Sequence, residues 1–175
     1  LGLNKPLPQQ YISYVTGLVK GDLGTSLRTK RPVLTEVQGR YMNTVQLTLL
    51  SLTWSVIAGV LIGVWSGRNR SKWQDYTGMT VAVSGISMPS FWIGFMLIMV
   101  FAVKYRLLPT TGADSFKNLI LPSITLGVSI AAIIARFTRS SVIEVLKEDY
   151  VRTARAKGLR EKTVIWKHVF RNCMI

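Results

Sequence analysis

The side chains that usually carry out chemistry are scarce in this sequence of 175 residues. It contains one histidine, His168, and one cysteine, Cys173. His168 has Lys167 and Arg171 as neighbours, so a metal site or a nucleophilic triad lacks the partners that it needs. The sequence also lacks a phosphate-binding loop of the GxxxxGK[ST] kind. We therefore expect no catalytic residue, no metal and no cofactor, and any ATP would be handled by another chain.

The most distinctive residues are instead the charged and small ones of segment 148–171, EDYVRTARAKGLREKTVIWKHVFR. Val151 and Ala154 lie three positions apart, and Gly158 follows four positions later. On a helix this spacing gives one narrow face that is nearly free of side chains. Gly158 also falls where the helix should end, because glycine adopts the left-handed cap conformation without a Cβ penalty. The cations around this face are Arg152, Arg155 and Lys157.

The second half of this segment has the pattern of an amphipathic helix. Its apolar residues recur at a helical period and so form a stripe along one side of the helix. Its cations lie off this stripe. The stripe consists of Ile165, Trp166, Val169, Phe170 and Cys173, and the cations are Lys162, Lys167 and Arg171. We therefore expect a helix, a glycine turn and an amphipathic helix at a membrane surface.

Long apolar runs must position this segment. Three stretches, 41–67, 76–103 and 118–135, contain no charged residue, and about 20 apolar residues are enough to cross the hydrocarbon core of a bilayer. A net charge of +14 suggests nucleic acid as a partner for a soluble domain, but a soluble fold of this length seldom has three such runs. The sequence therefore predicts an all-α membrane helix bundle. Its spans are expected at about 44–67, 77–103 and 119–138.

The charges between the runs predict the orientation of the chain. Residues 136–175 hold ten Lys/Arg and four acids, and the positive-inside rule places such a segment in the cytoplasm. The connection 68–75 then also lies in the cytoplasm, and 104–117 lies outside. Residues 1–40 lie outside as well, which is a mild misfit with their net charge of +4. The predicted parts are an extracytoplasmic segment, 1–40, and a transmembrane domain, 41–175, with a cytoplasmic loop at about 139–171.

Residues 1–40 are expected to contain one short amphipathic helix between turn residues. The apolar positions of this helix are Tyr11, Ile12, Tyr14, Val15, Leu18 and Val19. We expect it to pack on the outer surface of its own protein. Direct contact with a ligand is the alternative.

The first span carries Gly59, Gly63 and Gly67 at intervals of four residues. Small residues at this interval let two helices approach closely in lipid, where backbone packing holds helices together. We therefore predict that these glycines serve in helix packing within the bundle.

The second span contains the irregular stretch SGISMPSFWIG, residues 84–94. Pro89 removes a backbone donor and clashes with the preceding turn, so a kink or a break is expected there. Interrupted helices at mid-membrane often line translocation paths. A simple proline kink that helps packing is an equal alternative. The candidate path residues are Ser84, Ser87, Met88, Pro89 and Ser90.

The third span has Pro122 near its start, where a first helical turn accepts proline. Its inner end at about Phe137 is marked by Arg136 and Arg139. A further helix from Ser140 to about Asp149 is expected to continue into the cytoplasm.

Several of these stretches together resemble a known family. DYVRTARAKG, Asp149–Gly158, and KHVFRN, Lys167–Asn172, are similar to the cytoplasmic loop of inner-membrane permeases of bacterial ABC importers. The dipeptide, oligopeptide, glutathione and nickel branch is the most similar, and the sequence of these stretches is nearest to the glutathione type. The resemblance covers nearly the whole chain. Further matching stretches are Leu1–Tyr11, Gly21–Val33, Ala82–Gly94 and Leu108–Gly127.

The resemblance implies a coupling role for the first helix of the loop, which in this family docks in a cleft on an ATPase subunit. The small face at Val151, Ala154 and Gly158 would permit close approach, and the flanking cations would pair with acids of the partner. Closure of the ATPase dimer on ATP would then move this lever and reorient the spans. By position the coupling helix would comprise Asp149, Tyr150, Arg152, Thr153, Ala154, Arg155, Ala156 and Lys157, with Gly158 as its turn.

The resemblance also implies partners and a location. The partners would be a second permease subunit (a copy or a relative), two ATP-binding cassette subunits, an extracytoplasmic solute-binding protein and membrane lipid, with no nucleic acid. The chain would be a multi-pass protein of the bacterial inner membrane that moves small peptides or a related solute, such as glutathione or a nickel complex. Members of the family have one more span before the position of Leu1 and two more after that of Ile175. The resemblance therefore implies that this chain is an internal fragment.

The general loop pattern of ABC importers is only partly matched. This pattern is EAA, three residues, Gly, nine residues and Ile-x-Leu-Pro; here Arg152, His168 and Arg171 stand at the Glu, Ile and Pro positions. The peptide branch commonly departs in the same way. One alternative is a secondary carrier or channel, against which the lack of acids within the spans counts. Another is a membrane-anchored binder of nucleic acid or anionic lipid, which rests on the basic tail alone.

Overall fold

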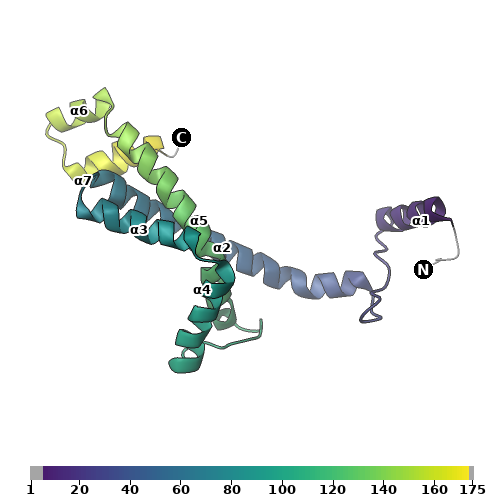
Figure 1. The fold of residues 1–175 in the computed structure, drawn as a ribbon. Coiled ribbons are helices and arrows are strands. Elements are labelled where there is room, and N and C mark those ends of the chain that lie inside the picture. The colour runs from purple at the N-terminus through teal and green to yellow at the C-terminus, as the bar shows by residue number, and fades with distance from the viewer. Residues whose placement is uncertain (1–5, 174–175) are drawn as a thin grey trace. The chain divides into compact units, whose positions relative to one another are not determined.

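The structure, a computed structural model, describes residues 6–173, and all its regular elements in this range are helical. The prediction of an all-α membrane helix bundle is confirmed. The chain divides into two units, 1–46 and 47–175, and α2 contributes to both. The elements, in which η marks a π-helix, are α1 (Leu7–Val19), α2 (Val33–Arg68), α3 (Trp73–Ser87), α4 (Ser90–Leu97), η1 (Ile98–Lys104), α5 (Phe116–Val145), α6 (Asp149–Ala156), α7 (Glu161–Thr163), η2 (Val164–Val169) and α8 (Phe170–Cys173) (Figure 1).

The first unit contains α1, a turn-rich stretch and the start of α2. α1 includes all six apolar positions of the predicted amphipathic helix, and Pro8 occupies its first turn, where a missing N–H is harmless. In the turn, the Gly24 N–H donates to the Asp22 carboxylate at 2.8 Å. No residue of α1 is buried, so packing of its apolar side on the protein stays a prediction. The first five residues of the matching stretch Leu1–Tyr11 lie outside the described residues.

Among the described helices, α2 and α5 are individually long and apolar enough to cross a membrane. α2 begins before the predicted first span, and α5 includes the predicted third span, 119–138. The helix expected from Ser140 is the C-terminal part of α5, which ends at Val145 and not at about Asp149; a new helix begins at Asp149. The charges at the inner end do not interrupt α5, since no glycine or proline follows Phe137 within it.

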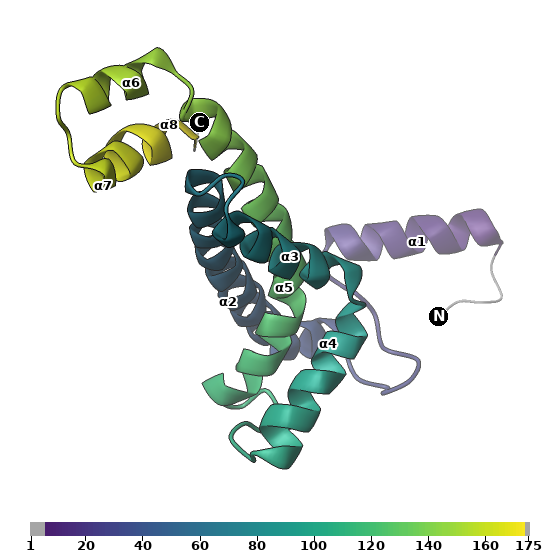
Figure 2. The same cartoon turned by 60° about the vertical axis from the view of Figure 1, so that its left-hand side comes forward.

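The second predicted span, 77–103, is a broken helix. α3 ends at Ser87, and α4 with η1 continues beyond a bend of 104°. Proline disfavours the helical conformation in the residue before it, and Met88 before Pro89 is extended, with φ −86° and ψ 131°. A bend of this size is a break in the helix and not a mild kink. Figure 2 shows α4 turning away from α3 while both lie along α5, and together the two parts qualify as one broken span or a re-entrant segment.

α2 meets α5 at the three predicted glycines with no room for a side chain. A Cβ built on any of the three would lie within 2.8 Å of an atom of α5. At Gly63 this Cβ would be 2.5 Å from Thr138 Cβ and 2.7 Å from the carbonyl oxygen of Ala135. Such distances are far below van der Waals contact, so only glycine permits this approach. The geometry supports the packing role proposed for Gly59 and Gly67 as well.

Two side chains of α2 extend this contact by hydrogen bonds that no local sequence pattern indicates. The indole N–H of Trp54 donates to the carbonyl oxygen of Ser123 at 2.9 Å. The hydroxyl of Ser55 donates to the carbonyl oxygen of Gly127, also at 2.9 Å. A Cβ on Gly127 would lie 2.5 Å from the Trp54 ring. This glycine of α5 therefore makes room for the aromatic side chain of α2.

Replacing Gly63 with alanine should destabilise the protein by about 1–3 kcal/mol, because the added methyl group overpacks the contact between α2 and α5. The matched control is Gly39→Ala in the same helix, where no described atom beyond the chain neighbours and the adjacent helix backbone lies within 4 Å of the added Cβ. Alanine favours a helix over glycine by about 1 kcal/mol, so the control should be neutral or stabilised. Thermal unfolding in detergent measures both, and equal midpoints would contradict the prediction.

Candidate functional site

Residues 149–173 fold into a helix, a turn and a second helical stretch, as the sequence predicts. α6 ends at Ala156, and Gly158 makes the turn with φ +76°, a conformation that favours glycine. The elements α7, η2 and α8 then follow one another directly from Glu161 to Cys173. Both Figure 1 and Figure 2 show α6 lying beside this second stretch. We call α6, the turn and the second stretch the loop unit.

The side of α6 that carries Val151 and Ala154 faces its own chain. Val151 is fully buried and Ala154 is 5% exposed, and both pack in a cluster with Val164, Ile165 and Val169. The expectation that these two residues form a docking face for a partner is therefore wrong. Their spacing marks the apolar side of an amphipathic helix, and the apolar stripe of the second helical stretch covers it.

The same cluster includes the C-terminal ends of two long helices. Val64 of α2 and Val142 of α5 belong to it, and Val60 and Val145 pack against it. Protein interiors are packed as densely as organic crystals, so a cluster of this kind transmits displacement instead of absorbing it. α6 is therefore mechanically continuous with the ends of α2 and α5.

Two polar contacts hold α6 on the second helical stretch. Arg155 forms a two-pronged ion pair with Glu161 across the glycine turn, with N–O distances of 3.2 and 2.8 Å. The side-chain amide of Asn172 donates to the Tyr150 hydroxyl at 2.9 Å. The expected pairing of Arg155 with an acid of a partner is wrong, because the carboxylate that it contacts is that of Glu161 in its own chain. An acid placed six residues after Arg155, beyond a glycine, was the available signal for this pair.

The outward face of α6 is polar and exposed. Arg152 lies 3.5 Å from Asp149, and both side chains are more than three-quarters exposed, so this pair contributes little to stability. The Thr153 hydroxyl donates to the carbonyl oxygen of Asp149 at 2.9 Å. Packing among the described residues does not use this face, which leaves it available to another molecule. It consists of Asp149, Arg152, Thr153, Ala156 and Lys157.

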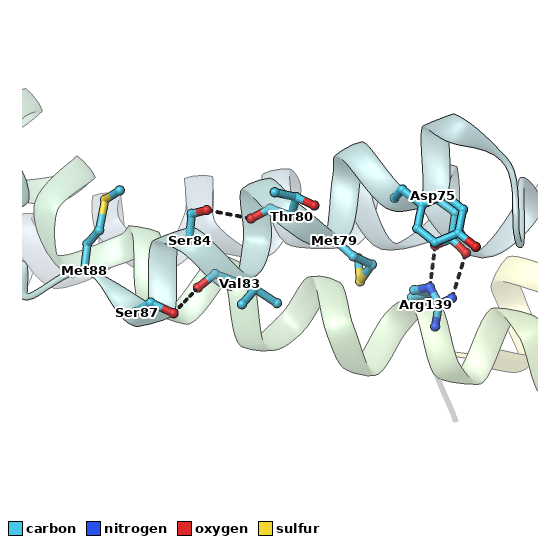
Figure 3. Close-up of a pocket in the computed structure, with 9 residues that line it drawn as sticks. Asp75, Met79, Thr80, Val83, Ser84, Ser87, Met88 and Arg139 are labelled. Atoms are coloured by element: carbon cyan, nitrogen blue, oxygen red, sulfur yellow. Dashed lines mark hydrogen bonds and ion pairs between the residues drawn. The ribbon is translucent and has the colours of Figure 1, made fainter.

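A groove of about 450 Å³ runs beside α3. Ser84, Ser87 and Met88 of the predicted path residues line it, whereas Pro89 and Ser90 do not. Figure 3 shows these side chains along one side of α3. The remaining lining residues are Asp75, Tyr76, Met79, Thr80, Val83 and Arg139.

The serine hydroxyls of the groove donate to their own helix. Ser84 donates to the carbonyl oxygen of Thr80 at 2.8 Å, and Ser87 donates to that of Val83 at 3.0 Å (Figure 3). A hydroxyl whose hydrogen is engaged still offers its lone pairs. The groove is therefore able to accept hydrogen bonds from N–H groups of a solute.

An ion pair with a buried carboxylate and a partly exposed guanidinium lies at one end of the groove. Asp75 in the first turn of α3 accepts from Arg139 of α5, with Nε–Oδ1 and Nη2–Oδ2 distances of 2.5 and 2.7 Å (Figure 3). It also accepts from the backbone N–H of Ser71 at 3.0 Å, and it is 3% exposed. The sequence predicts a cytoplasmic connection at Asp75 and the end of a span at Arg139. Sixty-four residues separate the two, so no local pattern connects them.

Known proteins resemble the chain over its whole length. A family model described as "binding-protein-dependent transport system inner membrane component" matches residues 59–175. Over 175 residues the chain is 52% identical to the glutathione transport system permease protein GsiC of Pectobacterium atrosepticum. It is 50% identical to the protein of that name from Escherichia coli and 49% to that from Salmonella choleraesuis. All of the chain is covered in each comparison, and it spans 57% of the length of these relatives.

The pair across the glycine turn predicts a pH dependence of stability. The hydrogen bonds from the Arg155 guanidinium hold the pKa of Glu161 below its ordinary value of 4.5. The pair therefore stabilises the folded protein above pH 4.5, and this contribution is lost as the pH falls through the lowered pKa. Both side chains are more than 40% exposed, so we expect a contribution of about 0.2–1 kcal/mol.

Thermal unfolding in detergent, followed from neutral to acidic pH, measures this effect. The Glu161→Gln variant should be less stable than the wild type at neutral pH and should approach it as the pH falls. Glu36→Gln is the matched control, because its partner Arg40 lies 3.8 Å away and is 79% exposed. A Glu161→Gln curve that runs parallel to the wild-type curve at all pH values would contradict the prediction.

Proposed function

Because the chain belongs to the family of binding-protein-dependent transport system inner membrane components, we propose that it forms the permease part of an ATP-driven ABC importer. Family membership sets the secondary-carrier alternative aside. One observation carries the proposal: the exposed polar face of α6 lies on a helix whose other face is packed in a cluster with α2 and α5. Such a helix is suited to be displaced by a partner on the cytoplasmic side and to transmit this displacement to the membrane spans.

The partner at the outward face is an ATPase subunit, and ATP hydrolysis takes place there. The exposed cations Arg152 and Lys157 attract acids of the partner, and Ala156 between them leaves room for close approach. Movement of the ATPase pair on ATP displaces α6, and the cluster around Val151 passes the displacement to α2 and α5 as a rigid-body motion. No chemistry within this chain is needed.

The remaining partners are those of a whole importer in the inner membrane. They are a second permease subunit, a second ATPase subunit, an extracytoplasmic solute-binding protein and the surrounding lipid. The relatives are glutathione transport permeases by name, and we propose glutathione or a small peptide as the solute. The groove supports this class of solute, because Ser84 and Ser87 present acceptors to peptide N–H groups.

The groove beside α3 is the proposed part of the translocation path in this chain. It combines hydroxyl groups with apolar walls from Met79, Val83 and Met88, and the helix that carries it is broken at Pro89. Broken helices in transporters expose backbone groups only where they line a cavity. Pro89 and Ser90 are assigned to the break itself and not to the wall of the groove.

Ala156 and Ala154 provide a matched test of the coupling role. In the full-length transporter complex with Cys173 replaced by serine, a cysteine at Ala156 should crosslink to cysteines in the ATPase cleft, with a yield that changes on addition of ATP. A cysteine at Ala154 should crosslink poorly, because that position is buried against the second helical stretch. Crosslinking is quantified by gel shift of the purified complex.

Two outcomes would overturn this proposal. One is that the Ala156 cysteine meets no ATPase subunit with or without nucleotide. The other is that it reacts with a membrane-impermeant thiol reagent added from outside, which would also overturn the predicted orientation.

A cysteine at Ser87 tests the groove. Its modification with a bulky thiol reagent should abolish most of the transport of glutathione or a labelled dipeptide into proteoliposomes, because the reagent fills the groove. The control is Ile86→Cys. Ile86 precedes Ser87 on α3, is 42% exposed and does not line the groove. Equal inhibition of the two modified variants would exclude the groove from the path.

A further inference from the structure

We propose that the Asp75–Arg139 ion pair is the positioning contact that carries movement of the loop unit into α3, and so into the groove. The inference rests on the proposed function, because it takes α6 as the helix that receives the movement. Neither residue needs to touch the solute for this role. What matters is that the pair connects the helix that leads to α6 with the helix that lines the groove.

The geometry of this pair differs from that of the other ion pairs in the described part of the chain. The Asp75 side chain is 4% exposed, whereas the acids of the other pairs are at least 21% exposed. Like the exposed Arg155–Glu161 pair, the contact is two-pronged, and such a pair has a defined orientation, unlike a single contact between point charges. The Asp75–Arg139 contact therefore resists both sliding and rotation of one helix against the other.

The rest of the contact between α3 and α5 is smooth. Its buried centre consists of the small side chains Ala82, Ala132 and Ala135, and Gly85 of α3 packs against Val128. Such surfaces hold helices together by van der Waals contact and have no bond that fixes their register. The other polar link described between the two helices, from the hydroxyl of Ser129 to the carbonyl oxygen of Gly85, is 3.4 Å long and therefore weak.

The position of Arg139 in the chain makes it the natural point of transfer. Val142, three residues later and on the same helix, belongs to the cluster that holds α6. α5 ends at Val145, and α6 begins at Asp149. A displacement of α6 therefore reaches α5 within one turn of Arg139. From Asp75 it continues along the rigid helix α3 to Ser84 and the break beyond it.

The experiment uses the full-length transporter complex, with cysteines at Ala82 and Ala135 and with Cys173 replaced by serine. These two positions belong to one packed cluster across α3 and α5. In this background the disulfide yield should be the same with and without ATP, because the ion pair makes the two helices move together. In Asp75→Asn the yield should fall on ATP addition, and transport should fall at least about fivefold, the lower range of an allosteric coupling.

Two further variants keep the test decisive. Arg139→Lys keeps the charge and loses the two-pronged geometry, so it should show the same changes to a smaller extent, and it decides the question if Asp75→Asn does not assemble. Glu36→Gln removes the same charge from an exposed pair and should behave like the wild type in both measurements.

The outcomes separate this inference from the proposed function. If transport falls but the disulfide yield stays independent of ATP, the pair has a purely structural role and the inference is overturned. The same holds if transport and yield both match Glu36→Gln. If the cysteine at Ala156 never crosslinks to an ATPase subunit in a protein that keeps Asp75 and Arg139, the proposed function itself is overturned, whatever the Asp75 variants do.

Discussion

The close approach of α2 to α5 at three successive glycines is the constraint on which the second unit depends. Because a side chain at Gly59, Gly63 or Gly67 would meet atoms of α5 within 2.8 Å, the two helices lie in direct backbone contact. This contact brings Val64 and Val142 together at the ends of the helices, where they form the base of the hydrophobic cluster. Without that base, the loop unit would have no surface on which to fold.

The loop unit divides its work between the two faces of a short helix. Val151 and Ala154 anchor α6 to its own chain, and the outward face remains for contact with another molecule. The two polar contacts, Arg155 with Glu161 and Tyr150 with Asn172, add orientation to this anchoring. A helix of eight residues is not stable alone in water, so its rigidity comes from the packing beneath it.

The groove depends on a different balance of forces. Proline disfavours the helical conformation in the residue before it; α3 ends before Pro89, and the chain then turns by 104°. The contact of α3 with α5 is made of small side chains, which permit movement, whereas the ion pair of the buried Asp75 with Arg139 fixes one point of it. The chain thus combines a surface that can slide with one directional contact at its end.

Composition and local spacing alone determined the apolar helices, the glycine contact positions, an interruption at Pro89 and the helix–turn–helix of the loop, because each follows from neighbours within a few residues. The tertiary structure decided which face of α6 is buried, since an apolar spacing such as Val151 and Ala154 looks the same whether its own chain or a partner covers it. It also decided the partners of Arg155 and Asp75, because a charge does not reveal its counterion until the fold brings distant helices together.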